Sequence, residues 1–242
     1  MMDLCGKPVL SHIIERLRLC ASVENIVLAT TVLPEDVVLD TIAAELGIAC
    51  YRGSSDDVLS RFYCAAQERP EQIVRICADS PLLDIGIVDA AVGYYSNAKA
   101  DIVKTVNMPL GLGAEVFSYY ALEHAYAHAL KAYQREHVTP YMYENMLVDT
   151  MSVEPNSAKY RLTLDTKEDL QVIQMLYTEL YKGKHDFFLE DIVRVLDENP
   201  EIAKINQHIQ QVKVPSTQSD QSVYDQSENC KQTLIDNVFA TG

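Results

Sequence analysis

The length, composition and charge of the chain exclude several classes of protein. Its 242 residues, 48% of them hydrophobic, are enough for one α/β domain or two small domains with a core of their own. The formal net charge of −15 argues against a basic surface for nucleic acid or an anionic membrane. Six scattered cysteines without a C-x-x-C pair indicate reduced thiols and a cytoplasmic location.

Helical and strand patterns alternate over the first hundred residues. Strand-like apolar runs occupy residues 25–31, 48–52 and 72–78, and helical stripes occupy residues 7–20, 34–47, 55–69 and 84–97. Strands that alternate with helices of this length indicate right-handed βαβ units. The sequence therefore predicts an α/β fold around a mostly parallel sheet.

The pattern changes from about residue 101. Strands are predicted at 101–107, 114–118, 150–155 and 160–165, and the Gly-rich segment MPLGLGA joins the first two. Helices are predicted at 119–132, at 135–146 with an interruption at Pro140, and at 166–183, with one or two more within 187–209. Residues 213–242 are polar and aperiodic, which predicts a flexible tail.

Polar side chains lie at the carboxyl ends of several predicted strands. Thr30, Arg52 and Asp79 lie at carboxyl ends, the edge at which open α/β sheets bind ligands. Pro81 ends the strand just after Asp79, and Asp165 closes a later strand. The two aspartates either bind one hard cation, which prefers carboxylate oxygens, or each caps the helix that follows.

Two pairs of residues spaced four apart each allow two interpretations. Asp57 and Arg61 share one helix face and form either a surface ion pair worth about 0.2–0.5 kcal/mol or part of a nucleotide site. His124 and His128 have the spacing of two metal ligands. Because the acid of an H-E-x-x-H motif is absent between them, we expect two solvated histidines.

Seven segments in one order carry a resemblance to a known family. They are GKPVLSHIIERL, IVLATT, YRGSSDDVLSRFYCAA, VRICADSPLLD, GLGAEVFS, REHVTPYMY and LTLDTKEDL. Together they resemble the spore-coat polysaccharide biosynthesis cytidylyltransferase-like family, which is related to acylneuraminate cytidylyltransferases and CMP-Kdo synthetases. The resemblance implies a three-layer α/β fold of the nucleotide-diphosphosugar transferase type. It implies one domain, with a nucleotide half at about 1–100, a sugar and dimer half at about 101–212, and the tail 213–242.

The resemblance also implies an activity and a set of site residues. A sugar hydroxyl attacks the α-phosphate of CTP in the presence of Mg²⁺, pyrophosphate leaves, and a CMP-activated acidic or surface-polysaccharide sugar forms. The implied partners are CTP and the sugar, without nucleic acid or membrane, in a cytoplasmic homodimer. The implied residues are Asp79 and Asp165 as catalytic Mg²⁺ ligands, Thr30, Arg52, Asp57 and Arg61 at the nucleotide, and Glu115, Glu136 and His137 at the sugar.

The chain departs from the family pattern at its beginning. Family members start with a strand and a Gly/Arg-containing turn that ends in Lys and holds the triphosphate, whereas this sequence starts at MMDLCGKPVL, after that point. We therefore expect a sheet that lacks the usual first strand, and impaired CTP binding and transfer. Two explanations stay open: either this start lies inside a longer gene, or the chain is a non-catalytic descendant that binds a sugar or a partner subunit.

Overall fold

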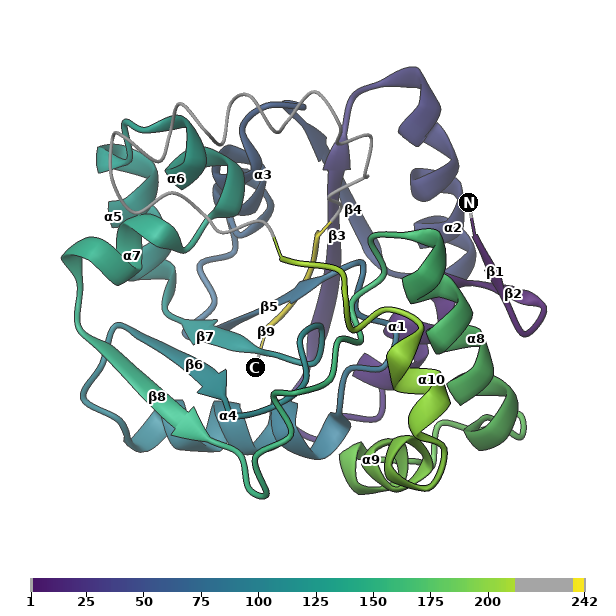
Figure 1. Cartoon of the computed structure of the whole chain (residues 1–242). Helices are drawn as coiled ribbons and strands as arrows, with labels where there is room; N and C mark the ends of the chain where they lie inside the picture. Colours follow the sequence, from purple (N-terminus) through teal and green to yellow (C-terminus); the bar gives the residue numbers. More distant parts are fainter. Residues whose placement is uncertain (1, 212–236, 242) are drawn as a thin grey trace.

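A seven-stranded sheet runs through the molecule, of which the computed structural model describes residues 2–211 and 237–241 (Figure 1). The order of the strands across the sheet is β4-β3-β9-β5-β7-β6-β8. Their bounds are β3 (Asn25–Thr31), β4 (Ala49–Gly53), β5 (Ile73–Cys77), β6 (Ile102–Val106), β7 (Glu115–Phe117), β8 (Val148–Ser152) and β9 (Asn237–Thr241).

Most strands of the sheet point in one direction. The pairs β3–β4 and β6–β8 are parallel, β7 runs antiparallel to β5 and β6, and β9 runs antiparallel to β3 and β5. Five of the seven strands that the described residues contribute to this sheet therefore share one direction. The mostly parallel α/β sheet predicted from the sequence is confirmed.

Two hydrophobic clusters cover the two faces of the sheet. Neighbouring residues alternate between them, because Leu28 and Val74 belong to one cluster, whereas Ala29 and Ile73 belong to the other. This is the period-2 alternation of a strand buried on both sides. The first cluster includes α1 (Val9–Leu17), α2 (Val37–Leu46), α4 (Ile85–Asn97), α8 (Lys167–Leu180), α9 (Leu189–Glu198) and α10 (Pro200–Lys204), and the second includes α3 (Val58–Ala65), α5 (Tyr119–His128) and α7 (Pro140–Asn145). The predicted three-layer architecture is confirmed.

The strand β9 corrects the prediction of a flexible tail at 213–242 for residues 237–241. Residues 237–241 pair with 25–29 of β3 and with 73–77 of β5, while residues 212–236 and 242 lie outside the described residues. The sequence predicts a sheet without its usual first strand. Without β9, the facing edges of β3 and β5 would have unpaired backbone groups along the gap between them. An extended segment in that gap satisfies both rows of N–H and C=O groups.

Two other segments differ from the predicted elements. The helix predicted at 7–20 begins at Val9, because β2 (Lys7–Pro8) pairs with β1 (Asp3–Leu4) in an antiparallel hairpin. The strand predicted at 160–165 forms only an isolated bridge, between Arg161 and Leu110. An apolar alternation predicts an extended segment, but a strand also needs a partner along its whole length.

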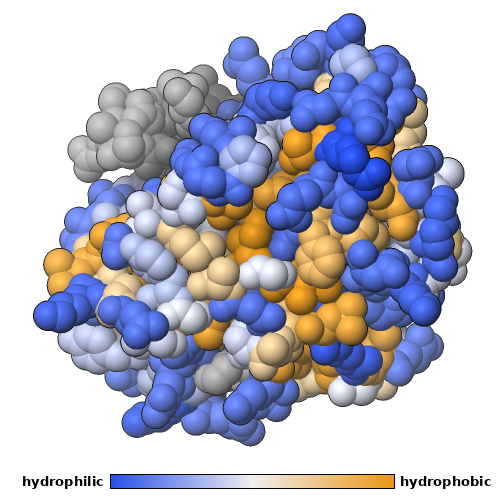
Figure 2. Space-filling model, turned by 90° about the horizontal axis from the view of Figure 1, so that it is seen from below, coloured by the Kyte–Doolittle hydropathy of each residue, from blue (hydrophilic) through white to orange (hydrophobic). Residues whose placement is uncertain are grey.

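The surface is not uniformly polar. Figure 2 shows the molecule from below, with hydrophilic side chains around the edge and an apolar area nearer the centre. The polar shell expected from a charge of −15 is therefore interrupted on this face.

None of the helices in the described residues combines the length and the apolar character that crossing a membrane requires.

Candidate nucleotide and sugar site

The carboxyl ends of β3, β4 and β5 lie at one edge of the sheet, because these strands share one direction. Thr30 is buried near the end of β3 and lies opposite Arg52 of β4 in the parallel register. The Arg52 guanidinium donates to the carbonyls of Thr31 at 2.9 Å and Leu33 at 2.8 Å. Arg52 therefore anchors the loop after β3, and its contact with a nucleotide stays a prediction.

Asp57 and Arg61 do not form the surface ion pair that the sequence allowed. Arg61 is 1% exposed, and its guanidinium donates to the Ser54 carbonyl at 2.5 Å. Asp57 is the N-cap of α3, where its carboxylate accepts the Ser60 N–H at 2.9 Å, and it also forms an ion pair with Arg135. Both residues shape the loop after β4, and their role in nucleotide binding stays a prediction.

The structure brings Asp79 and Asp165 together. The Leu164 N–H donates to the Asp79 carbonyl at 2.9 Å, which places the segment before Asp165 beside the end of β5. Burial raises the pKa of Asp79, and the nearby charge of Asp165 raises it further, although hydroxyls of Ser80 and Thr163 bind its carboxylate. The effect of Asp165 on the pKa of Asp79 requires the two carboxylates to lie close together.

Neither aspartate caps a helix, so the capping alternative is wrong. The N-cap of α4 is Asp84, whose carboxylate accepts the Ile87 N–H at 2.9 Å. The N-cap of α8 is Thr166, which forms the predicted capping box with Asp169. Asp79 and Asp165 thus lie close together just after β5 and just before α8 without capping either helix, and their role as metal ligands stays a prediction.

A glycine fixes the segment that carries Asp165. Gly111 has φ +96°, and a Cβ atom there would lie 2.4 Å from the backbone nitrogen of Thr163. The Leu162 N–H donates to the Leu110 carbonyl at 2.7 Å beside this contact. The Gly-rich segment therefore packs directly on the backbone that leads from Leu162 to Asp165.

Arg161 and Asp169 form an ion pair behind Asp165. The Arg161 guanidinium donates to Asp165 at 2.6 Å and to Asp169 at 2.9 Å. Burial alone would raise the pKa of Asp169, but hydrogen bonds from Arg161 and Asn206 lower it below its ordinary value. Asp169 therefore stays charged and holds Arg161, which in turn orients Asp165.

Glu115 is the centre of a second polar network at the sheet. It lies opposite Arg75 in the antiparallel register of β5 and β7, and the two form an ion pair of 2.7 Å. The hydroxyl of Thr139 donates to Glu115 at 3.0 Å, and that of Tyr143 also donates to it. Beside this network, burial raises the pKa of Cys77 to about 12, so Cys77 is a protonated packing residue at neutral pH.

The other predicted sugar residues lie at the end of α6 (Ala132–His137). Glu136 and His137 are partly buried, with 3.9 Å between the His137 Nε2 and a Glu136 carboxylate oxygen. The described contacts of this segment with Glu115 come from Thr139 and Tyr143, just beyond the helix. The sequence motif REHVTPYMY contains both, and their hydroxyl groups were the signal that the sequence analysis missed.

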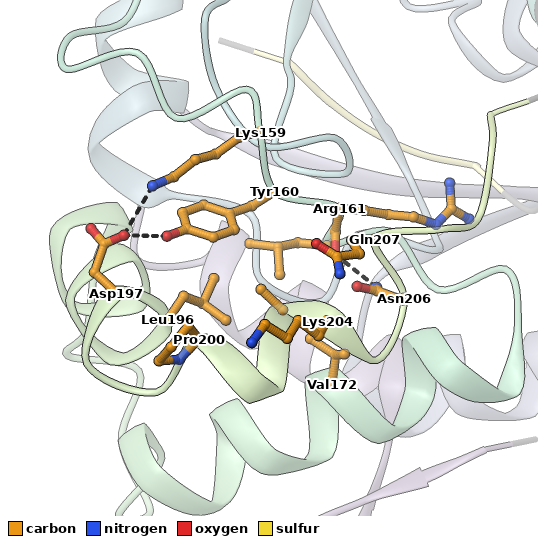
Figure 3. Close-up of a pocket in the computed structure, with 12 residues that line it drawn as sticks. Lys159, Tyr160, Arg161, Val172, Leu196, Asp197, Pro200, Lys204, Asn206 and Gln207 are labelled. Atoms are coloured by element: carbon orange, nitrogen blue, oxygen red, sulfur yellow. Dashed lines mark hydrogen bonds and ion pairs between the residues drawn. The ribbon is translucent and has the colours of Figure 1, made fainter.

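A cavity of about 270 Å³ lies away from these groups, between the 159–162 segment and helices α8, α9 and α10 (Figure 3). Lys159 and Tyr160 both bind Asp197 at its rim. None of the predicted site residues lines it. Arg161 connects the two regions, because its carbonyl accepts the Asn206 amide at 2.9 Å while its guanidinium binds Asp165. We therefore place the candidate site at Asp79 and Asp165, at the edge of the sheet, and not in this cavity.

Comparison with known proteins places this arrangement in a family. The family model described as cytidylyltransferase matches residues 1–193. The chain belongs to the cytidylyltransferase family. It is 39% identical to an uncharacterized protein of Methanocaldococcus jannaschii over 219 residues, which cover 87% of this chain and 88% of that protein. It is 29% identical to the spore coat polysaccharide biosynthesis protein SpsF of Bacillus subtilis, over 74% of this chain and 78% of that one.

Solved structures of cytidylyltransferases have the same fold. A cytidylyltransferase from Leptospira borgpetersenii has a TM-score of 0.77 and 28% sequence identity, covering 88% of this chain and 90% of that one. A CMP-2-keto-3-deoxy-manno-octonic acid synthetase, solved in complex with CTP, has a TM-score of 0.57 at 14% identity, covering 74% and 90%. The nucleotidyltransferase-type fold that the sequence predicts is therefore confirmed.

Proposed function

We propose that this cytidylyltransferase-family chain transfers CMP from CTP to a sugar hydroxyl and so prepares a CMP-sugar for a surface polysaccharide. The observation that carries the proposal is the convergence of Asp79 and Asp165 at the carboxyl edge of the sheet. The name of the SpsF relative supports a polysaccharide substrate. A 3-deoxy-manno-octulosonate cytidylyltransferase of Anaeromyxobacter dehalogenans, 25% identical over 171 residues, supports an acidic sugar.

The two aspartates fit a Mg²⁺ ion. Burial and then the nearby charge of Asp165 raise the pKa of Asp79. A bound divalent cation would offset both effects, and carboxylate oxygens are the ligands that Mg²⁺ prefers. Mg²⁺ bound there would supply charge neutralisation for the triphosphate and for the departing pyrophosphate. The chain itself holds Asp165 through Arg161 and holds Asp79 through its two hydroxyl partners.

The remaining predicted residues are proposed to position the two substrates. Thr30, Arg52, Asp57 and Arg61 surround the loops after β3 and β4, where a nucleotide would lie. On the sugar side, Glu115 is oriented by Arg75, and Glu136 and His137 lie on the segment whose Thr139 binds Glu115. Alignment of a sugar hydroxyl with the α-phosphate is the main contribution that such a site makes to nucleotidyl transfer.

A pyrophosphate-release assay tests the proposal. The full chain is incubated with Mg²⁺, each of the four nucleoside triphosphates and a panel of acidic sugars, and we expect release with CTP and one class of sugar. Asp165→Asn should reduce the rate by about 100-fold or more, which is the scale of losing one group that stabilises transition-state charge. Asp40→Asn, at an exposed position on α2, is the matched control.

The same assay addresses the alternative function. If no nucleotide and sugar pair gives pyrophosphate, while a sugar still binds by calorimetry, the non-catalytic descendant is the better interpretation. Impaired transfer, the homodimer and the cytoplasmic location stay predictions. A rate that is low with CTP but specific for it would support an impaired enzyme.

A further inference from the structure

A second cluster of polar residues lies apart from the proposed site, on the first helix. His12 and Glu15 are one turn apart on α1, and His185 lies in the loop between α8 and α9. One ligand atom from each residue lies within 4.8 Å of the other two. His12 is 0% exposed and His185 is 7% exposed. Figure 1 shows the helices α1 and α8 in the same half of the molecule.

A backbone carbonyl fixes the tautomer of His12. The His12 Nε2 lies 2.6 Å from the carbonyl oxygen of Leu4, and since a carbonyl only accepts, this nitrogen carries the ring proton. The Nδ1 atom therefore presents its lone pair to His185. A hydrogen bond from the remote ring nitrogen to a backbone carbonyl is the usual support for a histidine that binds a metal.

Two of the three separations between these ligand atoms match a metal site, and the third, between His12 and Glu15, is within 4.8 Å. The His12 Nδ1 lies 3.4 Å from the His185 Nε2, which lies 3.1 Å from a Glu15 carboxylate oxygen. With Zn–N distances of 2.0–2.1 Å, tetrahedral geometry places neighbouring ligand atoms about 3.3 Å apart. Two imidazoles and one carboxylate are a known zinc ligand set that leaves one position for water.

The surroundings also suit a bound cation. Lys7 donates to the other oxygen of Glu15 at 2.7 Å, which orients the carboxylate. Burial lowers the pKa of both imidazoles, that of His185 to about 4, so both rings are neutral at neutral pH. The rings of Tyr177 and Tyr181 lie 4.7 and 5.1 Å from His12 and form an apolar shell on one side.

We propose that the His12 Nδ1, the His185 Nε2 and a Glu15 carboxylate oxygen together bind one Zn²⁺ ion. The ion would tie α1 and the hairpin before it to the loop between α8 and α9. The same contacts without an ion describe a hydrogen bond from His185 to Glu15. Zinc binding at this cluster does not depend on cytidylyl transfer, so the two proposals are tested separately.

Titration of the metal-free full chain with Zn²⁺ alone, in competition with a chromophoric chelator, measures the stoichiometry and the affinity. We expect one Zn²⁺ per chain, an increase in the melting temperature with added Zn²⁺, and the visible spectrum of tetrahedral Co²⁺ when Co²⁺ replaces it. Glu15→Gln and His185→Gln keep the size and polarity of each side chain, whereas replacing the fully buried His12 endangers folding. Loss of a residue that only supports a metal ligand typically weakens metal binding by roughly 10- to 100-fold. Each of these variants removes a ligand itself, so it should weaken Zn²⁺ binding by more than that.

The chain provides a matched control in its other histidine pair. His124 and His128 stack on α5 with ring centroids 4.2 Å apart, and the double variant His124→Asn/His128→Asn should bind Zn²⁺ like the unmodified chain. Binding that survives both Glu15→Gln and His185→Gln overturns the proposal. So does binding that disappears with the His124/His128 pair, or a folded chain that takes up no Zn²⁺.

Discussion

Asp79 carries its charge at a cost to folding. Its pKa is raised above the usual 3.8 by burial and then by Asp165, so the folded chain binds this proton more tightly than the unfolded chain. The contribution of Asp79 to the free energy of unfolding therefore falls as the pH rises from 3.8 through the folded pKa. Such a cost is typical of a group retained for function and not for stability.

Asp79→Asn should therefore separate stability from activity. We expect a higher free energy of unfolding than in the unmodified chain at neutral pH, with the difference shrinking as the pH falls toward 3.8. Cytidylyl transfer should fall by about 100-fold or more. Urea unfolding at several pH values and the pyrophosphate assay measure the two effects.

Asp40→Asn is the control for this experiment, since Asp40 is exposed on α2. It should change neither the pH dependence of unfolding nor the rate. An Asp79→Asn chain with near-normal activity would remove Asp79 from the proposed metal site. An unchanged pH dependence would show that Asp79 is not buried beside another charge.

Glu115→Gln should destabilise the fold. The substitution leaves the Arg75 guanidinium, whose side chain is 12% exposed, without its ion-pair partner in the sheet. Removing one member of a buried pair typically costs about 3 kcal/mol or more, and urea unfolding measures it. The double variant Arg75→Met/Glu115→Gln should recover part of the loss, whereas a loss below about 1 kcal/mol in the single variant would mean that solvent screens the pair.

Sequence patterns identified some of these residues and missed others for a physical reason. The position of Asp79 just after a strand could be predicted because Pro81 ends that strand, and the structure ends β5 at Cys77; its role as a ligand-binding residue stays a prediction. The ion pair of Asp57 with Arg135 joins residues 78 positions apart. The spacing of apolar residues within one helix or strand cannot predict a contact over that distance. For Arg61 the sequence allows either a surface ion pair with Asp57 or a place in a nucleotide site, whereas the fold buries its side chain and its guanidinium donates to the Ser54 carbonyl.

At the scale of elements, the Gly-rich connection from β6 to β7 positions the second half of the site. Gly111→Ala should be costly, because a left-handed φ of +96° and a Cβ atom 2.4 Å from a backbone nitrogen both oppose a side chain there. Strain of this kind costs about 1–3 kcal/mol, and any backbone shift that relieves it moves the segment before Asp165. We expect both lower stability in urea and a lower rate of transfer.

Gly113→Ala is the matched control for Gly111→Ala. A Cβ atom at Gly113 would have Thr105 Oγ1 as its nearest neighbour at 3.5 Å, an ordinary contact, and its φ is not left-handed. The control should therefore be nearly neutral. Equal effects of the two substitutions would show that the close approach to Thr163 does not position Asp165.

Element types were predicted better than strand pairing. The helices at 34–47 and 166–183 were recognised from their start and stop residues, and the structure places α2 and α8 within them. The extended segment 160–165 was also recognised, but it meets only Leu110 in one bridge. Periodicity reports which face of a segment is apolar, whereas pairing depends on which partner the fold brings alongside.

At the scale of the whole molecule, the sheet is completed by residues from opposite ends of the described chain. The strand β9, at residues 237–241, separates β3 from β5, so the sheet is continuous only through it. The sequence NVFAT has the β-branched and aromatic residues of a strand, but it follows a long polar stretch. Its pairing partners lie more than 150 positions earlier, which is why composition alone predicted a tail.

Removing β9 should therefore destabilise the entire sheet. In a chain ending at Asp236, β3 and β5 lose their shared partner, and at about 1 kcal/mol net for each lost hydrogen bond the free energy of unfolding should fall by several kcal/mol. The exposed edges should also promote aggregation. Urea unfolding measures the first effect, and hydrogen exchange at the amides of β3 and β5 should show lost protection.

Two further chains make this prediction specific to the backbone pairing of β9. A chain ending at Thr241 keeps the whole strand and should match the full sequence in stability. Val238→Pro keeps the length but removes one backbone N–H from the middle of β9, and it should reproduce part of the loss. If the chain ending at Asp236 unfolds at the same urea concentration and keeps its amides protected, β3 and β5 do not depend on β9, and residues 237–241 belong to the dispensable tail that their composition predicts.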